Sequence, residues 1–229
     1  MDELMTVIGG MLVFALIVFV LLVVLIVWAV RKAMAKAKTI GKAPEYKHVD
    51  TDGPVSTEQV VSILKKYTHR YAVGDLAREG IVAIESADRK RDSFYAALDA
   101  KFEPETISWD RFAVGADSAL SAIEKATAQL CNGIQSFDSD EYRRLEQNFK
   151  AESAAGTPHD PTQEERLGML IGRLDGMKEI VAGNQRMLLE MDKLEAELVK
   201  LESTERSDRG DQILQEIRTL TEEMKYYKS

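Results

Sequence analysis

The sequence predicts an all-α protein: a single N-terminal transmembrane helix, then a cytoplasmic helical bundle with a C-terminal hairpin of long helices. Three observations indicate this. A long uncharged apolar segment stands near the N-terminus, apolar residues then recur at steps of three or four, and strand-like alternation is not sustained. With 45% apolar, 30% charged and 7% aromatic residues, the 229-residue chain favours one helical domain besides its anchor.

The anchor is predicted over residues 7–30, which contain no charge and no proline. As a helix this segment covers ~36 Å at ~1.5 Å per residue, enough to cross a hydrocarbon core of ~30 Å. Residues 1–6 form a short extracytoplasmic N-terminus, and their acidic Asp2 and Glu3 differ from the basic leader of a cleaved signal peptide.

An aromatic anchor and basic residues are expected at the membrane interface, namely Trp28, Arg31, Lys32, Lys36 and Lys38. The positive-inside rule keeps this basic flank in the cytoplasm. We therefore expect a single-pass protein of the cell membrane with its N-terminus outside and its C-terminal domain cytoplasmic.

Residues 31–55 are expected to be a basic juxtamembrane segment and linker, because apolar periodicity disappears and glycines and prolines follow. A helical body over 56–153 comes next. Ser56 with Gln59 fits a capping box that begins its first helix, and Ser108 is expected to cap the helix after Pro104.

A Pro/Gly linker over 154–161 separates the body from a coiled-coil-like hairpin over 162–229. Thr162 with Glu165 fits a second capping box, and the helix it begins is expected to reach about residue 201. Asn184 interrupts its apolar seam. The hairpin is expected either to dock on the body or to recruit a partner, through a possible partner-helix face formed by Leu174, Met177, Met187, Met191, Leu194 and Leu198.

No motif indicates catalysis. His48, His69 and His159 are far apart, none belongs to a metal-ligand pair, and no phosphate-binding loop or nucleophile elbow occurs. We therefore assign no catalytic, cofactor-binding or metal-binding residue, and we expect no cofactor. No motif supports an enzymatic activity. Cys131 is expected to be a buried hydrophobe.

Charge is polarised along the chain. Five of the 30 basic and two of the 38 acidic residues precede position 43, which leaves a net charge of −11 for residues 43–229. Such a body repels nucleic acid, so no nucleic-acid partner is expected. The basic pairs and runs at His69-Arg70 and Arg89-Lys90-Arg91 could bind an anion, although solvated helix faces also carry such charges.

Several stretches carry a family resemblance: Ile107-Ser-Trp-Asp-Arg-Phe112, Phe137-Asp-Ser-Asp-Glu-Tyr142, Asn184-Gln-Arg-Met-Leu-Leu-Glu-Met-Asp-Lys-Leu194 and Met224-Lys-Tyr-Tyr-Lys228. Together they resemble helical bacterial proteins found alongside TelA-type toxic-anion-resistance proteins, some of which are labelled bromochloroindolyl phosphate hydrolysis proteins. The resemblance covers roughly residues 56–228 and implies an accessory role in bacterial envelope or toxic-anion stress. It transfers no catalytic residue.

Three functions follow as hypotheses. The first is a membrane-anchored cytoplasmic interaction or scaffold protein, whose partners are the lipid bilayer and either another protein or a second copy of the chain. The second is a phosphate-ester hydrolase or related enzyme. The third is a coiled-coil membrane organiser that assembles with itself through the long helix over 162–201.

Overall fold

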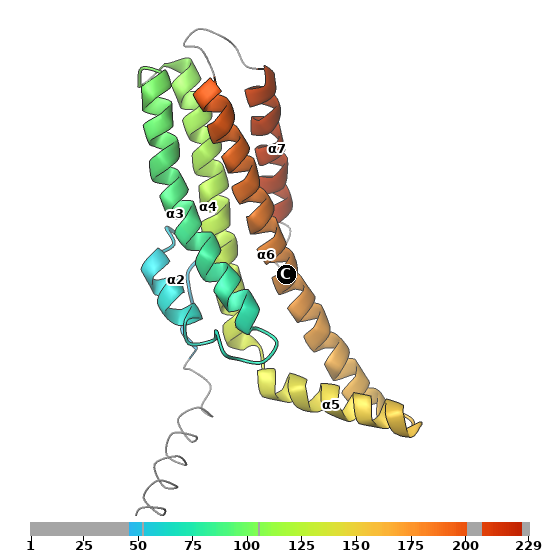
Figure 1. Cartoon of the computed structure of the whole chain (residues 1–229). Coiled ribbons are helices and arrows are strands. Elements are labelled where there is room, and N and C mark those ends of the chain that lie inside the picture. Colours follow the sequence, from blue (N-terminus) through green and yellow to red (C-terminus); the bar gives the residue numbers. More distant parts are fainter. Residues whose placement is uncertain (1–45, 52, 105, 201–207, 226–229) are drawn as a thin grey trace, which may run out of the picture. The chain divides into compact units, whose positions relative to one another are not determined.

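The computed structural model describes residues 46–51, 53–104, 106–200 and 208–225, and these residues form helices and no strand. The prediction of an all-α fold and a helical bundle is therefore confirmed. The helices are α2 (Thr57–Leu64), α3 (Gly74–Lys101), α4 (Ile107–Ser136), α5 (Ser139–Ala155), α6 (Pro161–Lys200) and α7 (Asp208–Lys225) (Figure 1).

The predicted membrane span over 7–30, with Trp28, Arg31, Lys32, Lys36 and Lys38, lies outside the described residues. None of the helices from α2 to α7 combines the length and the apolar character that crossing a bilayer requires.

The core of the bundle is formed by α3, α4 and α6 (Figure 1). Arg91 of α3 pairs with Glu124 of α4, and further along α3 Asp99 accepts a hydrogen bond from Trp109, nearer the start of α4, so these two helices are antiparallel. Large apolar side chains from all three helices are fully buried where they meet, among them Phe94, Leu98, Leu120, Ile123, Leu130, Met187, Met191, Leu194 and Leu198. The burial of these stripes is the main source of the bundle's stability.

Helix α7 packs against both α4 and α6. Arg111 of α4 forms an ion pair with Asp211 at 2.7 Å, and the side chain of Leu214 lies over Gly115 one turn further along both helices. A Cβ at position 115 would overlap Leu214 Cδ2, so glycine permits this close approach. Helix α7 therefore runs parallel to α4.

Two of the three predicted helix starts differ from the structure. Ser56 is the N-cap of α2, as expected, and its Oγ accepts a hydrogen bond from the Gln59 amide. Thr106 caps α4 in place of Ser108. Helix α6 starts at Pro161, where Asp160 Oδ1 accepts from the Thr162 amide. Proline suits the first position of a helix, and the aspartate before it caps a free amide of the first turn. These two residues explain why α6 starts before the predicted cap at Thr162.

Helix α5 and the first half of α6 form an arm that leads away from α3 and α4 (Figure 1). Among the described helices, α5 packs against α6 alone. The chain turns between them at Gly156, whose φ of +66° is a left-handed conformation that glycine adopts without strain. The arm consequently has two helical layers and a thin apolar seam.

Candidate functional site

The predicted partner-helix face is part of this chain's own core. Leu174 and Met177 are 7% and 5% exposed, and Met187, Met191, Leu194 and Leu198 are fully buried. Met177, for example, lies against Gly133 of α4. The interpretation of this stripe as a face open to another chain is wrong, because the bundle's own helices cover it.

Asn184 makes a buried polar contact within this stripe. Its Nδ2 donates a hydrogen bond to Thr127 Oγ1 of α4 at 3.0 Å, and Thr127 in turn donates to the Ile123 carbonyl. Asn184 Oδ1 has no hydrogen-bond partner in the structure. Asn184, the polar residue that interrupts the apolar stripe of α6, thus pairs with Thr127 of α4.

The segment before α2 is held on α4 by two side-chain amides, which the sequence analysis missed. Gln135 Oε1 accepts from the Lys47 amide at 2.8 Å, and Gln135 Nε2 donates to the Lys47 carbonyl at 2.9 Å. Asn132 makes the same pair of bonds with Val49, at 3.0 and 2.9 Å. The Val49 side chain is buried. We call this arrangement the amide clamp.

The amide clamp lies within the segment predicted to be a linker up to residue 55. Residues 47 and 49 are attached to the body because the backbone amide and carbonyl of each form hydrogen bonds with a side-chain amide on one face of α4. A sequence signal existed. Asn132 and Gln135 are amides three positions apart near the end of an apolar helix, a spacing that places them on one face.

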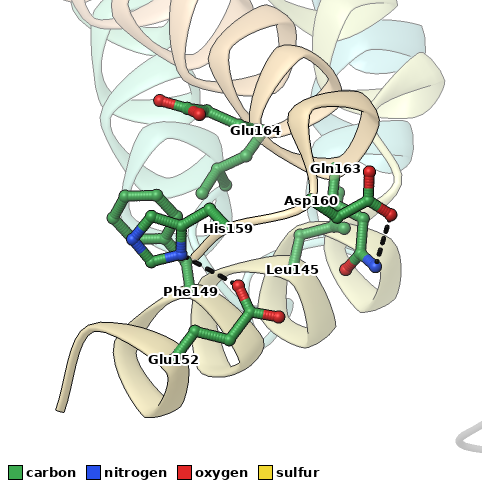
Figure 2. A pocket seen from close by; sticks show the side chains of 8 residues that line it. Leu145, Phe149, Glu152, His159, Asp160, Gln163 and Glu164 are labelled. Carbon is green, nitrogen blue, oxygen red and sulfur yellow. Dashed lines mark hydrogen bonds and ion pairs between the residues drawn. The ribbon is translucent and has the colours of Figure 1, made fainter. Parts of the chain in front are cut away.

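The tip of the arm brings together a serine, a histidine and a carboxylate. His159 stacks on Phe149 with ring centroids 3.9 Å apart. Its Nδ1 lies 2.9 Å from Glu152 Oε2 (Figure 2). Its Nε2 lies 3.2 Å from Ser153 Oγ. Since a carboxylate accepts hydrogen bonds, a neutral His159 would carry its proton on Nδ1 and accept from the Ser153 hydroxyl through Nε2.

This chain of contacts has the order of nucleophile, base and orienting acid that serine hydrolases use. A hydrolase also needs donors for the developing oxyanion. The amides of Gly156 and Thr157 already donate to carbonyls of α5, and those of Thr162 and Glu164 donate to Asp160. The end of α5 presents carbonyls, whose partial negative charge opposes an oxyanion.

The recess beside His159 is too small for a substrate. It has a volume of about 10 Å³, the space of one water molecule, and is lined by Leu145, Phe149, Glu152, His159, Asp160, Gln163, Glu164 and Leu167. Figure 2 shows its carboxylates, which would repel a phosphate ester. The contacts are those of a clasp that holds the end of α5 against the start of α6.

Two other sequence candidates are occupied by structural contacts. Lys90 pairs with Asp192 and Glu195 of α6, and Arg91 pairs with Glu124 of α4, so this basic run connects the core helices. Cys131 is fully buried, and its burial raises the pKa of the thiol to about 12. Within the described ranges, no three potential metal ligands converge.

One surface of the arm exposes glycines and apolar side chains. Gly168, Gly172 and Gly176 are four residues apart and so lie along one face of α6, and a Cβ added at any of them would meet nothing within 4 Å. Met169 and Ile171, which are 58% and 41% exposed, flank this face. We call these five residues the arm face.

The chain matches no family model, no curated protein and no solved structure. The resemblance to proteins that accompany TelA-type resistance proteins therefore remains a hypothesis that rests on the quoted stretches.

Proposed function

We propose that this protein is a membrane-anchored helical scaffold, which holds a cytoplasmic bundle by the span over 7–30 and presents the arm formed by α5 and the first half of α6 to a protein partner. The observation that carries the proposal is the arm face. It combines exposed apolar side chains with glycines that allow another backbone to approach closely, on an element that the rest of the bundle leaves uncovered.

The remainder of the described chain supports a binding role over an enzymatic one. The recess at the arm tip has the space of one water molecule, and the amides of Gly156, Thr157, Thr162 and Glu164 near the histidine are already bonded. The α6 stripe, which would otherwise be a second candidate interface, is buried against α4 and its neighbours. The arm face is exposed, so a partner could bind it without rearrangement of the bundle.

A site-specific photo-crosslinker tests this proposal in the full chain in membranes. A benzoylphenylalanine at position 171 is expected to form one discrete adduct, whereas the same group at Val82 of α3, which is 55% exposed, is expected to form none. Met169→Glu should abolish the adduct at 171. Equal adducts at both positions would contradict the proposal, and recovery of the chain without membranes after gentle lysis would contradict the anchor.

Self-assembly is a second candidate, favoured by the charges beside the arm face. At 100° per residue, Arg166 and Arg173 lie on one side of the glycines, and Glu164 and Asp175 lie on the other. In a parallel pair of helices, opposite sides of the two copies meet, so each arginine side would face the acidic side of its partner. A parallel arrangement also suits two chains anchored in one membrane.

Charge reversal separates the two candidates. A second copy as partner predicts that Arg173→Asp weakens the dimer and that combining it with Asp175→Arg restores it, as measured by the mass of the detergent-purified full chain. A mass of one chain for the unchanged protein at all concentrations would exclude self-assembly and leave the partner-protein role.

The process we propose, an accessory role in bacterial envelope or toxic-anion stress, rests on the resemblance alone. Deletion of the gene should then sensitise cells to toxic oxyanions, and growth equal to that of the parent strain would remove this part of the proposal.

A further inference from the structure

One end of the bundle carries a group of exposed basic residues. The turn after α2 contains Lys65, Lys66 and His69, and the neighbouring first half of α5 contributes Arg143 and Arg144. The two segments touch: Arg70 pairs with Asp140 at 3.7 Å, and the Arg143 guanidinium lies 4.6 Å from the centre of the Tyr71 ring. We call this surface the cationic end.

The carboxylates at the cationic end are engaged by other cations or by backbone amides. Glu141 pairs with Arg166, Glu146 pairs with Lys150, and Asp138 caps α5. By contrast, no ion pair in the described part of the chain involves Lys65, Lys66 or Arg144. The excess charge at this end is therefore positive, although residues 43–229 together carry −11.

Exposed aromatic residues accompany these cations. Tyr46 is 52% exposed, and Tyr71 is 37% exposed with its hydroxyl donating to Glu146 Oε2 at 2.5 Å. Tyrosine, lysine and arginine are the residues typical of the interface between a membrane and water, because tyrosine combines an apolar ring with a polar hydroxyl and the cations attract lipid phosphates.

The connection to the predicted anchor arrives at this same end. Figure 1 shows the described chain beginning beside the turn after α2 and the end of α4. The amide clamp holds Lys47 on Gln135, one residue from the end of α4. From there, 16 residues separate Lys47 from the end of the predicted span at position 30. The clamp thus fixes, at the cationic end, the point from which the chain continues toward the predicted anchor.

We propose that the cationic end docks on anionic lipid headgroups, and that this contact together with the amide clamp sets the orientation in which the arm is presented. The inference rests on the membrane anchor of the proposed function. An acidic body tethered close to an anionic surface is repelled in every orientation except the one that turns its positive end toward the lipid. Lys65, Lys66, Arg143 and Arg144 supply that attraction.

The test uses the full chain reconstituted in vesicles, with a fluorophore at His69→Cys and nitroxide-labelled lipid as quencher. Quenching in vesicles of equal parts phosphatidylcholine and phosphatidylserine is expected to exceed that in pure phosphatidylcholine several-fold, and to fall in high salt. The same label at Val114→Cys, an exposed position in the first turns of α4, is expected to show no such difference.

A matched pair of variants isolates the cations. The triple variant Lys65→Gln, Lys66→Gln, Arg144→Gln should lose the phosphatidylserine dependence at position 69. The triple variant Lys125→Gln, Arg186→Gln, Arg218→Gln, which removes the same charge elsewhere on the bundle, should keep it. Circular dichroism of both variants checks that they fold.

The outcomes separate the inference from the proposed function. A chain that floats with both kinds of vesicle but shows no dependence on phosphatidylserine, or equal dependence at positions 69 and 114, overturns the docking of the cationic end and leaves the anchor intact. A chain that floats with neither overturns the anchor and the inference together.

Discussion

The side-chain amide of Asn184 donates to the hydroxyl of Thr127 at 3.0 Å, a contact that joins α6 to α4 inside the core. Both residues are almost completely buried, and Asn184 Oδ1 has no partner. An apolar pair could slide by one turn without losing a specific contact, whereas this pair satisfies its hydrogen bond in one register. The pair thus specifies how the two helices align more than it stabilises them.

Removal of one partner of this pair is expected to cost more than removal of both. Thr127→Val leaves the Asn184 amide without its acceptor and should lower the free energy of unfolding by about 1–3 kcal/mol. Adding Asn184→Leu removes the unpaired groups and should recover most of that loss. Urea unfolding of the full chain in detergent micelles measures both values, and a double variant as unstable as the single one would contradict this account.

Two glycines on different helices are expected to respond in opposite directions to alanine. A Cβ at Gly74 would stand 2.7 Å from the backbone oxygen of Thr68, so Gly74→Ala should destabilise the bundle by about 1–3 kcal/mol. Gly172 faces open space, and Gly172→Ala should stabilise α6 by up to about 1 kcal/mol because alanine is the better helix former. Thermal unfolding compares the two variants, and the same sign for both would show that local space does not decide the effect.

The amide clamp predicts a local change in hydrogen exchange. In the double variant Asn132→Ala, Gln135→Ala, the amides of Lys47 and Val49 lose their acceptors, and their exchange should accelerate. A contribution of about 0.5–1.5 kcal/mol per hydrogen bond corresponds to a factor of roughly 2–13 for each amide. Asn148→Ala on α5 serves as the control, because Asn148 bonds to Gln163 and is remote from the clamp. Unchanged exchange at both amides would contradict the clamp.

Burial of Cys131 predicts a stability that depends on pH. The pKa of its thiol is about 12 in the folded chain, against an ordinary value of 9.0. Because the folded state holds this proton more tightly, its contribution is fully present below pH 9 and is lost as the pH rises from 9 to 12. The loss amounts to about 1.4 kcal/mol per pH unit in that window.

The comparison with Cys131→Ala isolates this effect from lysines and tyrosines that titrate over the same range. Between pH 9 and pH 10, the free energy of unfolding of the cysteine form should fall by about 1 kcal/mol relative to that of Cys131→Ala, because the unfolded thiol is only half ionised at pH 9. A difference that stays constant with pH would show that the thiol is accessible to solvent in the folded state.

The sequence by itself determined that the described chain is helical and where most helices lie. Spacing of apolar residues by three or four identifies a helix without reference to its neighbours, and Ser56 could be identified as a cap because capping is local. The starts at Thr106 and Pro161 were displaced by a few residues, since several adjacent polar residues could serve as the cap and the tertiary turn selects one.

Only the tertiary structure decided what each face meets. The stripe through Met187 and Leu194 looks the same in the sequence whether it contacts another chain or the chain's own α4, because periodicity reports that a face is apolar and not what covers it. The clasp between His159 and Glu152 depends on a left-handed turn at Gly156, and the cationic end joins residues 70–71 to residues 140–143. Such contacts join segments that are distant in the sequence. They arise from tertiary packing, and the residue pattern of one segment does not show which other segment it contacts.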